Sequence, residues 1–293
     1  MNLTYYVPSV HQQTGRFPYA YEKNIYPIIP ASHHVRKSLL SAPSRHHPRR
    51  PWPSVCHHPE AIGNLTQENS IGGHLSRIHG EQGRCPDEHS ADSLEAHGIA
   101  SLRFDFNGHG QSEGRYEAMT VPNEIEDAQR VIAYAHSLPW VGPVILAGHS
   151  QGGVVAAMAS AQMGKKAVTG RILLAPAGVL RDDALRGNTF GAQYDPQNPP
   201  ETVRLWGGHL LGGDFIRTAV SLPIYETARQ YKGPQLVIHG ECDRIVPYTY
   251  GERFHQESHK SRFELMKNAD HGFGGMEKQV ARLCIEFTEK ICR

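Results

Sequence analysis

The sequence predicts an α/β fold in which helices flank a mostly parallel central sheet. From about residue 93 onward, short apolar runs rich in β-branched residues alternate with longer amphipathic stretches, the pattern of strands and helices in a parallel sheet. At 293 residues, the chain is also long enough to bury one full-sized core. We therefore expect two parts: an atypical, partly irregular segment over residues 1–92 and one folded domain over residues 93–293.

Apolar runs of strand length and stretches with helical periodicity alternate through the folded domain. The expected strands are residues 99–106, 143–149, 171–177 and 235–240, and a last strand is expected within 263–270. The expected helices are residues 123–138, 152–163 and 275–292, where apolar side chains recur at helical spacing. The last of these helices would close the domain.

The segment from about residue 28 to 92 is rich in His, Arg, Pro and Ser and has no sustained periodicity. Such a stretch cannot supply the apolar face that a strand or helix needs for docking, so we expect it to be irregular. Several of its residues are of types that bind zinc, but their spacings match none of the usual paired-ligand patterns, and we expect no metal site. These residues are Cys56, His57, His58, His74, His79, Cys85 and His89.

Charge and cysteine content narrow the class of partner. A formal net charge of +1 gives no large field that would favour nucleic acid or an anionic membrane. The five cysteines are scattered and odd in number, which favours a reducing compartment. The chain start lacks a basic stretch followed by an apolar one, and no run of about 18 apolar residues occurs. We expect a cytoplasmic protein that binds a small neutral or weakly anionic molecule.

A Gly-x-Ser-x-Gly motif marks a candidate nucleophile. Residues 148–152 read Gly-His-Ser-Gln-Gly, directly after an apolar strand and directly before a helix. In such a turn the serine holds a strained backbone conformation, and small residues on both sides prevent clashes. The bare motif arises easily by chance, so the strand-turn-helix context carries the prediction. Ser150 is the expected nucleophile, and the backbone N–H of Gln151 is an expected oxyanion donor.

A serine nucleophile needs a base, and the base needs an orienting acid. In this arrangement the acid and the histidine follow the serine along the chain, each in a loop after a late strand. Asp243 is the expected acid, with Glu241 as the alternative, and His271 is the expected base. The other histidines that we weighed fit structural positions better: His239 inside an apolar strand, His149 in the turn, His109 in a turn near Asp105, and His255 and His259 on a polar helix.

Residues 93–293 resemble the cinnamoyl and feruloyl esterases, bacterial proteins with the α/β-hydrolase fold. The resemblance lies in LRFDFNGHGQSEG, NEIEDA, GHSQGGVVA, LLAPAG, DALRGNTFGAQYDP, LGGDFIRTAVSLPIYE, LVIHGECDRIVPY and ADHGF. It implies the same catalytic residues, Ser150, Asp243 and His271. It also implies a small lid insertion at about 181–228.

The resemblance implies a substrate pocket under this lid. Asp183 matches a position that contacts a phenolic ring and its hydroxyl, although a helix cap is an equal alternative for this residue. Phe190 and Phe215 stand where some relatives carry polar partners. Apolar side chains there keep ring packing but lose hydrogen bonds, which weakens discrimination for a hydroxyl.

The sequence departs from the family before residue 93. Family members carry a His-Gly-Phe turn about thirty residues before the RFDF strand, and the backbone there supplies a second oxyanion donor. The nearest fit is His79-Gly80, followed by Glu81, and the flanking strand and helix patterns are missing. We therefore assign Gly80 as the second donor and hypothesise that residues 38–92 are scrambled or frame-shifted. Weak activity and poor solubility follow as expectations, because uncovered edges and apolar faces promote association.

The expected function is hydrolysis of carboxylic esters, most of all hydroxycinnamoyl esters of the feruloyl type, through an acyl-enzyme and without a cofactor. A broad short-acyl esterase or acylglycerol lipase is one alternative. A hydrolase-fold protein impaired by loss of its second oxyanion donor is the other. The expected partner is a small-molecule ester, with no nucleic acid or membrane, and a homodimer is left open.

Overall fold

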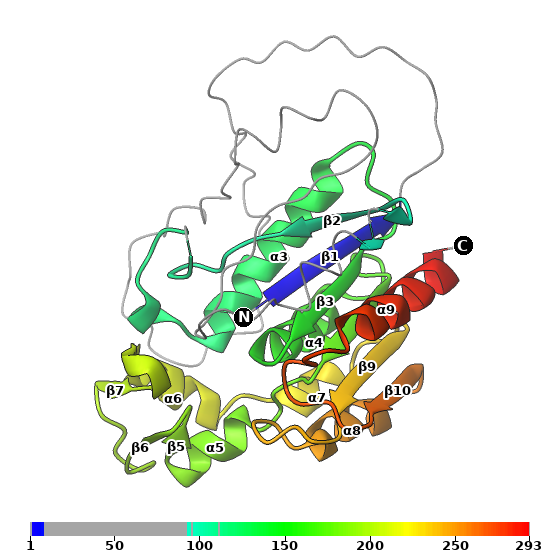
Figure 1. Ribbon diagram of the computed structural model, residues 1–293. Helices are drawn as coiled ribbons and strands as arrows, with labels where there is room; N and C mark the ends of the chain where they lie inside the picture. Colours follow the sequence, from blue (N-terminus) through cyan, green and yellow to red (C-terminus); the bar gives the residue numbers. More distant parts are fainter. Residues whose placement is uncertain (1, 9–92, 95, 111, 293) are drawn as a thin grey trace. The chain divides into compact units, whose positions relative to one another are not determined.

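A six-stranded sheet organises this computed structural model, which describes residues 2–8, 93–94, 96–110 and 112–292 (Figure 1). The strand order is β10-β9-β4-β3-β1-β2. The strands are β1 (Asn2–Pro8), β2 (Ile99–Arg103), β3 (Ile145–His149), β4 (Gly170–Leu174), β9 (Gln235–Gly240) and β10 (Ser261–Met266). The strands expected from the apolar runs are therefore confirmed, and the sheet joins β3, β4, β9 and β10 in parallel.

Strand β1 is the strand of the six-stranded sheet that the sequence pattern did not predict. It lies between β2 and β3 and runs antiparallel to both, with Asn2 opposite His149 and Pro8 opposite Ile99. The start of β1 is thus level with the carboxyl end of β3. An interior position in the sheet is therefore filled by a segment from the start of the chain. No local sequence pattern around residue 99 could indicate this pairing.

Side chains alternate between two cores, one on each face of the sheet, as the period of a strand requires. On β3, Leu146 belongs to one cluster of buried residues and Ile145 to the other. Helix α9 (Glu277–Cys292) covers the second cluster with Val280, Leu283 and other buried residues. The first cluster contains residues of α3 (Val121–Ser137), α4 (Gln151–Met163), α7 (Ile224–Ala228) and α8 (Tyr248–Gln256).

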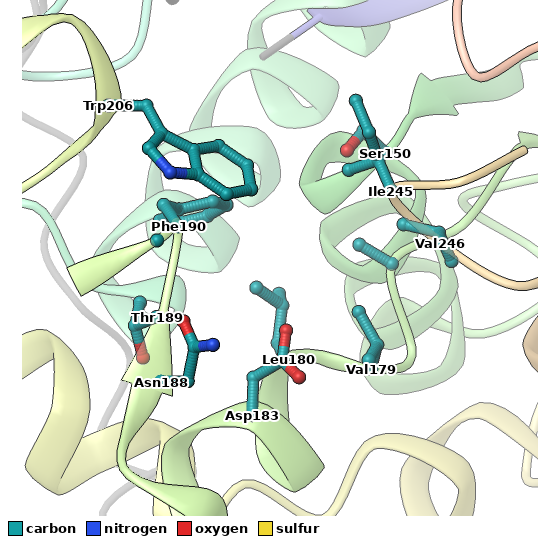
Figure 2. Close-up of a pocket in the computed structure, with 12 residues that line it drawn as sticks. Ser150, Val179, Leu180, Asp183, Asn188, Thr189, Phe190, Trp206, Ile245 and Val246 are labelled. Atoms are coloured by element: carbon teal, nitrogen blue, oxygen red, sulfur yellow. The ribbon is translucent and has the colours of Figure 1, made fainter. Parts of the chain in front are cut away.

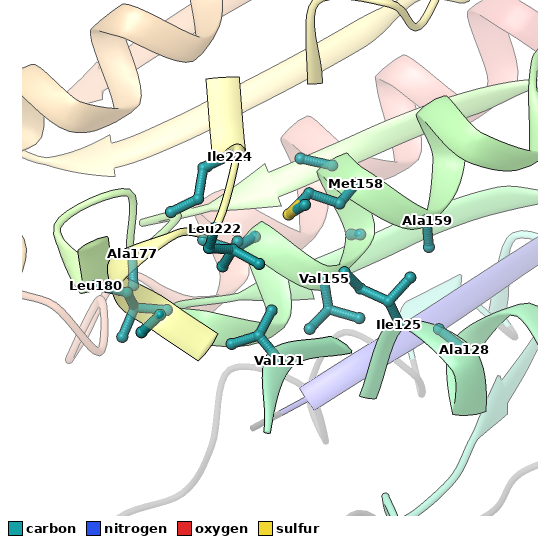
Figure 3. Packing of buried hydrophobic residues seen from close by; sticks show 14 of the residues in the cluster. Val121, Ile125, Ala128, Val155, Met158, Ala159, Ala177, Leu180, Leu222 and Ile224 are labelled. Atoms are coloured by element: carbon teal, nitrogen blue, oxygen red, sulfur yellow. The ribbon is translucent and has the colours of Figure 1, made fainter. Parts of the chain in front are cut away.

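Helix α3 shows why these stretches fold as they do. Thr120 caps its start, because the Thr120 hydroxyl accepts a hydrogen bond from the backbone N–H of Asn123 at 3.3 Å. Val121, Ile125 and Ala128 then recur on one face and pack toward α4, where Figure 3 shows Val155 and Ala159 among their neighbours. Burial of this stripe fixes α4, and with it the residue that precedes α4.

An insertion, residues 180–228, separates β4 from β9. It consists of α5 (Leu180–Arg186), the hairpin β5 (Asn188–Thr189) with β6 (Ala192–Gln193), the hairpin β7 (Thr202–Arg204) with β8 (Leu210–Gly212), α6 (Gly213–Val220) and α7. Two short 3₁₀ helices, Tyr116–Ala118 and Trp206–Gly208, complete the described elements. The insertion begins where β4 delivers the chain to the carboxyl edge of the sheet, the edge at which β3 also ends.

Candidate active site

Ser150 occupies a strained turn between β3 and α4. Its backbone has φ 57° and ψ −123°, a conformation that L-residues rarely adopt. Such strain persists only where the surroundings fix it. The Ser150 N–H donates to the Leu174 carbonyl at 2.9 Å, and the Ser150 carbonyl accepts from the Ala177 N–H at 2.9 Å. The end of β4 therefore holds the turn from both sides.

Glycine is required two residues before the serine. A Cβ atom at Gly148 would collide with the carbonyl group of Gly152, so the strand and the first turn of α4 can approach only without that side chain. The turn presents Ser150 at the start of α4, where the first backbone N–H groups have no partner within the helix. Gln151 is the first of these residues.

The structure brings Asp243 and His271 together. The His271 Nδ1 atom lies 2.7 Å from the Asp243 Oδ2 atom, although the two residues come from loops after different strands, β9 and β10. The second carboxylate oxygen of Asp243, Oδ1, accepts hydrogen bonds from the backbone N–H groups of Ile245 at 2.9 Å and Val246 at 2.8 Å.

These contacts set the charge of Asp243. Burial alone would raise its pKa, but hydrogen bonds from His239, His271 and the Val246 backbone hold the pKa far below the usual range. Asp243 is therefore an anion at any pH near neutrality. An anion at Oδ2 makes Nδ1 of His271 the protonated nitrogen, which leaves Nε2 as the lone-pair atom of the neutral ring.

His149 anchors the loop that carries His271. The His149 Nε2 atom lies 2.7 Å from the His271 carbonyl oxygen and so donates to it, and the two rings are 4.7 Å apart. Because His149 directly precedes Ser150, this bond ties the His271 loop to the strained turn. His149 is thereby committed as a donor, and it lies in the turn, the structural position expected for it.

The remaining alternatives occupy other places. Glu241 is exposed and accepts from the backbone N–H of Asn268 at 3.3 Å. His109 is buried against the rings of Phe106 and Tyr116, and burial lowers its pKa to about 4. Among the described residues, Asp243 is thus the acid that contacts His271.

The Gln151 side chain points into the core. Its Nε2 atom donates to the Glu124 carboxyl at 2.8 Å, and both residues are buried. Burial raises the pKa of Glu124 to about 8, so this carboxyl is largely neutral at pH 7. Gln151 can therefore face a reacting oxygen only with its backbone N–H.

Ser150 opens onto a pocket whose walls come mainly from the insertion (Figure 2). In Figure 2, Ser150 and Asp183 lie at different ends, with Phe190 and Trp206 along one wall. Ile245 and Val246, next to Asp243, form the wall beside Ser150. The complete lining is Ser150, Ala177, Val179, Leu180, Asp183, Asn188, Thr189, Phe190, Gly191, Trp206, Ile245 and Val246.

Asp183 lies inside α5, three residues after its first residue, and is not the cap of that helix. This position contradicts the helix-cap alternative. Its side chain is 35% exposed, and its nearest cationic neighbour, Arg186, is 3.8 Å away. Partial burial raises the pKa of Asp183 above its ordinary value. The pocket therefore ends in a partly buried carboxyl group whose ion pair with Arg186 is long.

The two phenylalanines differ. Phe190 lines the pocket, whereas Phe215 is fully buried and absent from the lining. Helix α6 turns Phe215 into the core, where its ring lies 5.8 Å from the ring of Phe190. The expectation of direct contact is thus wrong for Phe215, which supports Phe190 from behind.

Several pocket residues were not predicted from the sequence. Trp206, Asn188 and Thr189 come from short hairpins and a 3₁₀ turn whose patterns are too brief to place them. Gly80, the expected second oxyanion donor, and residues 38–92 lie outside the described part of the chain. Within the described ranges, no group of three metal-binding side chains gathers, and no helix is long and apolar enough to cross a membrane.

Comparisons with known proteins agree with this fold. The family model described as serine aminopeptidase, S33 (Hydrolase_4) matches residues 78–193. The AB hydrolase superfamily protein YisY of Bacillus subtilis (strain 168) is 25% identical over 223 residues, which cover 66% of this chain and 82% of that protein.

Solved structures agree. Est1E of Butyrivibrio proteoclasticus with bound ferulic acid aligns with a TM-score of 0.67 and 26% identity, over 71% of this chain and 83% of that one. The monoacylglycerol lipase of Paleococcus ferrophilus aligns with a TM-score of 0.52 and 19% identity, over 68% and 86%. The fold is thus that of the α/β-hydrolases. This chain is similar to a protein of the AB hydrolase superfamily and to the Est1E structure with bound ferulic acid.

Proposed function

We propose that this chain is a serine carboxylesterase that cleaves hydroxycinnamoyl esters through an acyl-enzyme on Ser150. One observation carries the proposal: the strained Ser150 and the carboxyl of Asp183 line a single, mainly apolar pocket, and the Asp243–His271 pair is tied to the turn that holds Ser150. The similarity to Est1E, a structure with bound ferulic acid, supports the same substrate class. We place this reaction in the cytoplasm, with a small ester as the partner and no cofactor.

In the proposed mechanism, Ser150 Oγ attacks the ester carbonyl carbon while Nε2 of His271 takes the hydroxyl proton. Asp243 holds the ring in the required tautomer and stabilises the imidazolium that forms. The imidazolium then gives its proton to the alcohol oxygen as the C–O bond breaks. Water attacks the acyl-enzyme in the same way, and the carboxylic acid leaves with Ser150 regenerated.

The negative oxygen of each tetrahedral intermediate needs donors. The backbone N–H of Gln151, at the amino terminus of α4, is the proposed first donor. The backbone N–H of Gly80 remains the proposed second oxyanion donor. Removing one such donor elsewhere costs about 10² to 10³ in rate, so the chain would remain a slow esterase with one donor alone.

The shape of the pocket supports an aromatic acyl group. Phe190 and Trp206 can pack on a ring along one wall, and Asp183 stands at the end away from Ser150 (Figure 2). The carboxylate of Asp183, which Arg186 approaches no closer than 3.8 Å, can accept a hydrogen bond from a phenolic hydroxyl. The insertion would then act as the lid of the acyl site, with Asp183 and Phe190 as the substrate-binding residues.

A substrate panel tests the proposal. Initial rates are measured for methyl ferulate, methyl p-coumarate, methyl cinnamate and methyl butyrate. We expect the two hydroxylated aromatic esters, methyl ferulate and methyl p-coumarate, to be cleaved fastest. Equal or higher kcat/KM for methyl butyrate would instead assign the chain to the broad short-acyl esterases or acylglycerol lipases. Absence of turnover for all four esters, with Ser150 unlabelled by a fluorophosphonate probe, would assign an impaired hydrolase-fold protein.

A further inference from the structure

A second histidine contacts the carboxylate of Asp243. His239 lies on β9 and is fully buried, and its Nε2 atom is 3.2 Å from Asp243 Oδ2 and 2.9 Å from the Val246 carbonyl oxygen. Its place inside an apolar strand predicted a core residue, and burial agrees with that prediction. His239 is more than a core residue, because both of its hydrogen-bond contacts are with the loop that carries Asp243.

The proton of His239 is located by its neighbours. A carboxylate oxygen and a carbonyl oxygen are both acceptors, so Nε2 carries the proton and donates to both. The other ring nitrogen, Nδ1, is buried and has no hydrogen-bond partner among the described residues. An apolar side chain would fill this space without leaving a polar atom unpaired, so packing alone does not account for a histidine here.

Helix α8 has no side chain at the point where it meets this ring. Gly251 lies against the ring, and a Cβ atom added there would collide with Nδ1 of His239. The glycine thus leaves room for the imidazole in its observed orientation. Strand, helix and loop together fix the ring in the position from which Nε2 reaches Asp243.

We propose that His239 is a positioning residue, which holds Oδ2 of Asp243 in line with Nδ1 of His271 through its bond to that oxygen and to the Val246 carbonyl. This inference rests on the proposed function, because it assigns Asp243 and His271 to the same catalytic unit. His239 itself touches no substrate. It acts by limiting rotation of the Asp243 carboxylate.

The carboxylate then has four donors. Ile245 and Val246 donate to Oδ1, while His271 and His239 donate to Oδ2. The titratable groups that meet here are Asp243 and His239 from β9 and its loop, His271 from the loop after β10, and His149 from β3, whose ring lies 4.7 Å from that of His271; α8 presents Gly251. Loss of the His239 donor makes the carboxylate of Asp243 more basic, because that hydrogen bond lowers the pKa of Asp243. The acid limb of the pH–rate profile should therefore move to higher pH.

The test compares three variants with the unmodified full chain, using p-nitrophenyl acetate as the probe ester. His239→Leu removes the donor, His239→Gln keeps an N–H donor near the Nε2 position, and Gly251→Ala pushes the ring away without touching the acid. Thr288→Val is the matched control, since Thr288 is also fully buried but bonds to the Cys284 carbonyl in α9.

For His239→Leu we expect kcat to fall on the order of tenfold, with KM nearly unchanged and the acid limb of kcat/KM displaced upward. Gly251→Ala should act in the same direction, and His239→Gln should recover most of the rate. The downfield proton resonance of His271 Nδ1–H should shift in His239→Leu and return in His239→Gln. Thr288→Val should lower the melting temperature without moving the resonance or the acid limb.

The proposal is overturned if His239→Leu keeps its kcat, acid limb and resonance, or changes stability alone as the control does. It is also overturned if His239→Gln, folded, is no better than His239→Leu. If His239→Leu does not fold, the pair His239→Gln and Gly251→Ala decides by the same criteria. If the unmodified chain cleaves no ester, the proposed function fails, and the His271 resonance alone decides on His239.

Discussion

Two regions of the molecule differ in how firmly their side chains are held. The first is the pair of loops after β9 and β10, and the second is the part of the pocket wall formed by the insertion. At the first, Asp243 receives four hydrogen bonds and its loop is tied to the strained turn of Ser150 through His149 and His271. At the second, Asp183 is 35% exposed, with Arg186 no closer than 3.8 Å, and Trp206 is 67% exposed. A network of hydrogen bonds thus fixes the catalytic carboxylate of Asp243 on all sides. The side chains of the proposed acyl site are partly exposed and make few polar contacts.

This difference teaches where variation can occur. A change of about 1 Å in a catalytic group can cost about a hundredfold in rate, so the network must be rigid. A pocket wall selects among substrates by packing and a few polar groups, each worth a modest factor. Mutations in the network should therefore lower rates for every ester, whereas mutations in the wall should change the ranking of esters.

The largest effect is expected for Ser150→Ala and His271→Ala. Each should lower kcat/KM for every ester in the panel by about a thousandfold or more, because the residues act as one unit. Thermal unfolding should stay close to that of the unmodified chain. Selective loss of one ester class in either variant would contradict the separation between the two regions.

Asp243→Asn should be nearly as damaging, because an amide cannot stabilise the imidazolium and favours the wrong tautomer of His271. Glu241→Gln is the matched control, since Glu241 is exposed and its carboxylate accepts a hydrogen bond from the backbone N–H of Asn268. Steady-state rates of both variants measure the difference. Near-normal activity in Asp243→Asn, with loss in Glu241→Gln, would transfer the acid role to Glu241.

Asp183→Asn should act on selectivity. We expect the ratio of kcat/KM for methyl p-coumarate over methyl cinnamate to fall about tenfold, because one hydrogen bond to a charged group is at stake. Rates for methyl butyrate should change little. A uniform loss across all esters would place Asp183 in the catalytic network and break the comparison.

The smallest effect on rate, but a clear effect on stability, is expected for Glu124→Gln. Burial raises the pKa of Glu124 from 4.5 to about 8, so folding keeps the proton that the unfolded chain releases. Stability from this group is complete below pH 4.5 and declines by up to about 1.4 kcal/mol per pH unit as pH rises toward 8. Urea unfolding at pH 5 and pH 8 should show that decline in the unmodified chain and a weaker one in Glu124→Gln.

The sequence predicted those parts that local patterns encode. The apolar runs placed β3, β4 and β9, and the Gly-x-Ser-x-Gly motif placed Ser150 between β3 and α4. The contact between Asp243 and His271 followed from chain order and loop positions, because parallel strands bring their following loops to one edge of the sheet.

The failures have physical causes. Strand β1 pairs with residues about a hundred positions away, and such pairing leaves no local trace. Phe215 was expected in the pocket, but the direction of a side chain on α6 depends on how the helix docks. Pocket residues on short hairpins, such as Thr189, lie in segments too brief to show a period.

The central claim is that Ser150 forms an acyl-enzyme, and the most direct test is to trap that intermediate during turnover and measure its mass. The protein is mixed with p-nitrophenyl acetate, quenched in acid within the first turnovers, digested and analysed by mass spectrometry. The account predicts an acetyl group on the peptide that contains Ser150. The same peptide of Ser150→Ala should carry none. The acetylated fraction should rise under conditions that slow hydrolysis of the acyl-enzyme. An acetyl group only on another residue, or turnover that persists in Ser150→Ala, would contradict it.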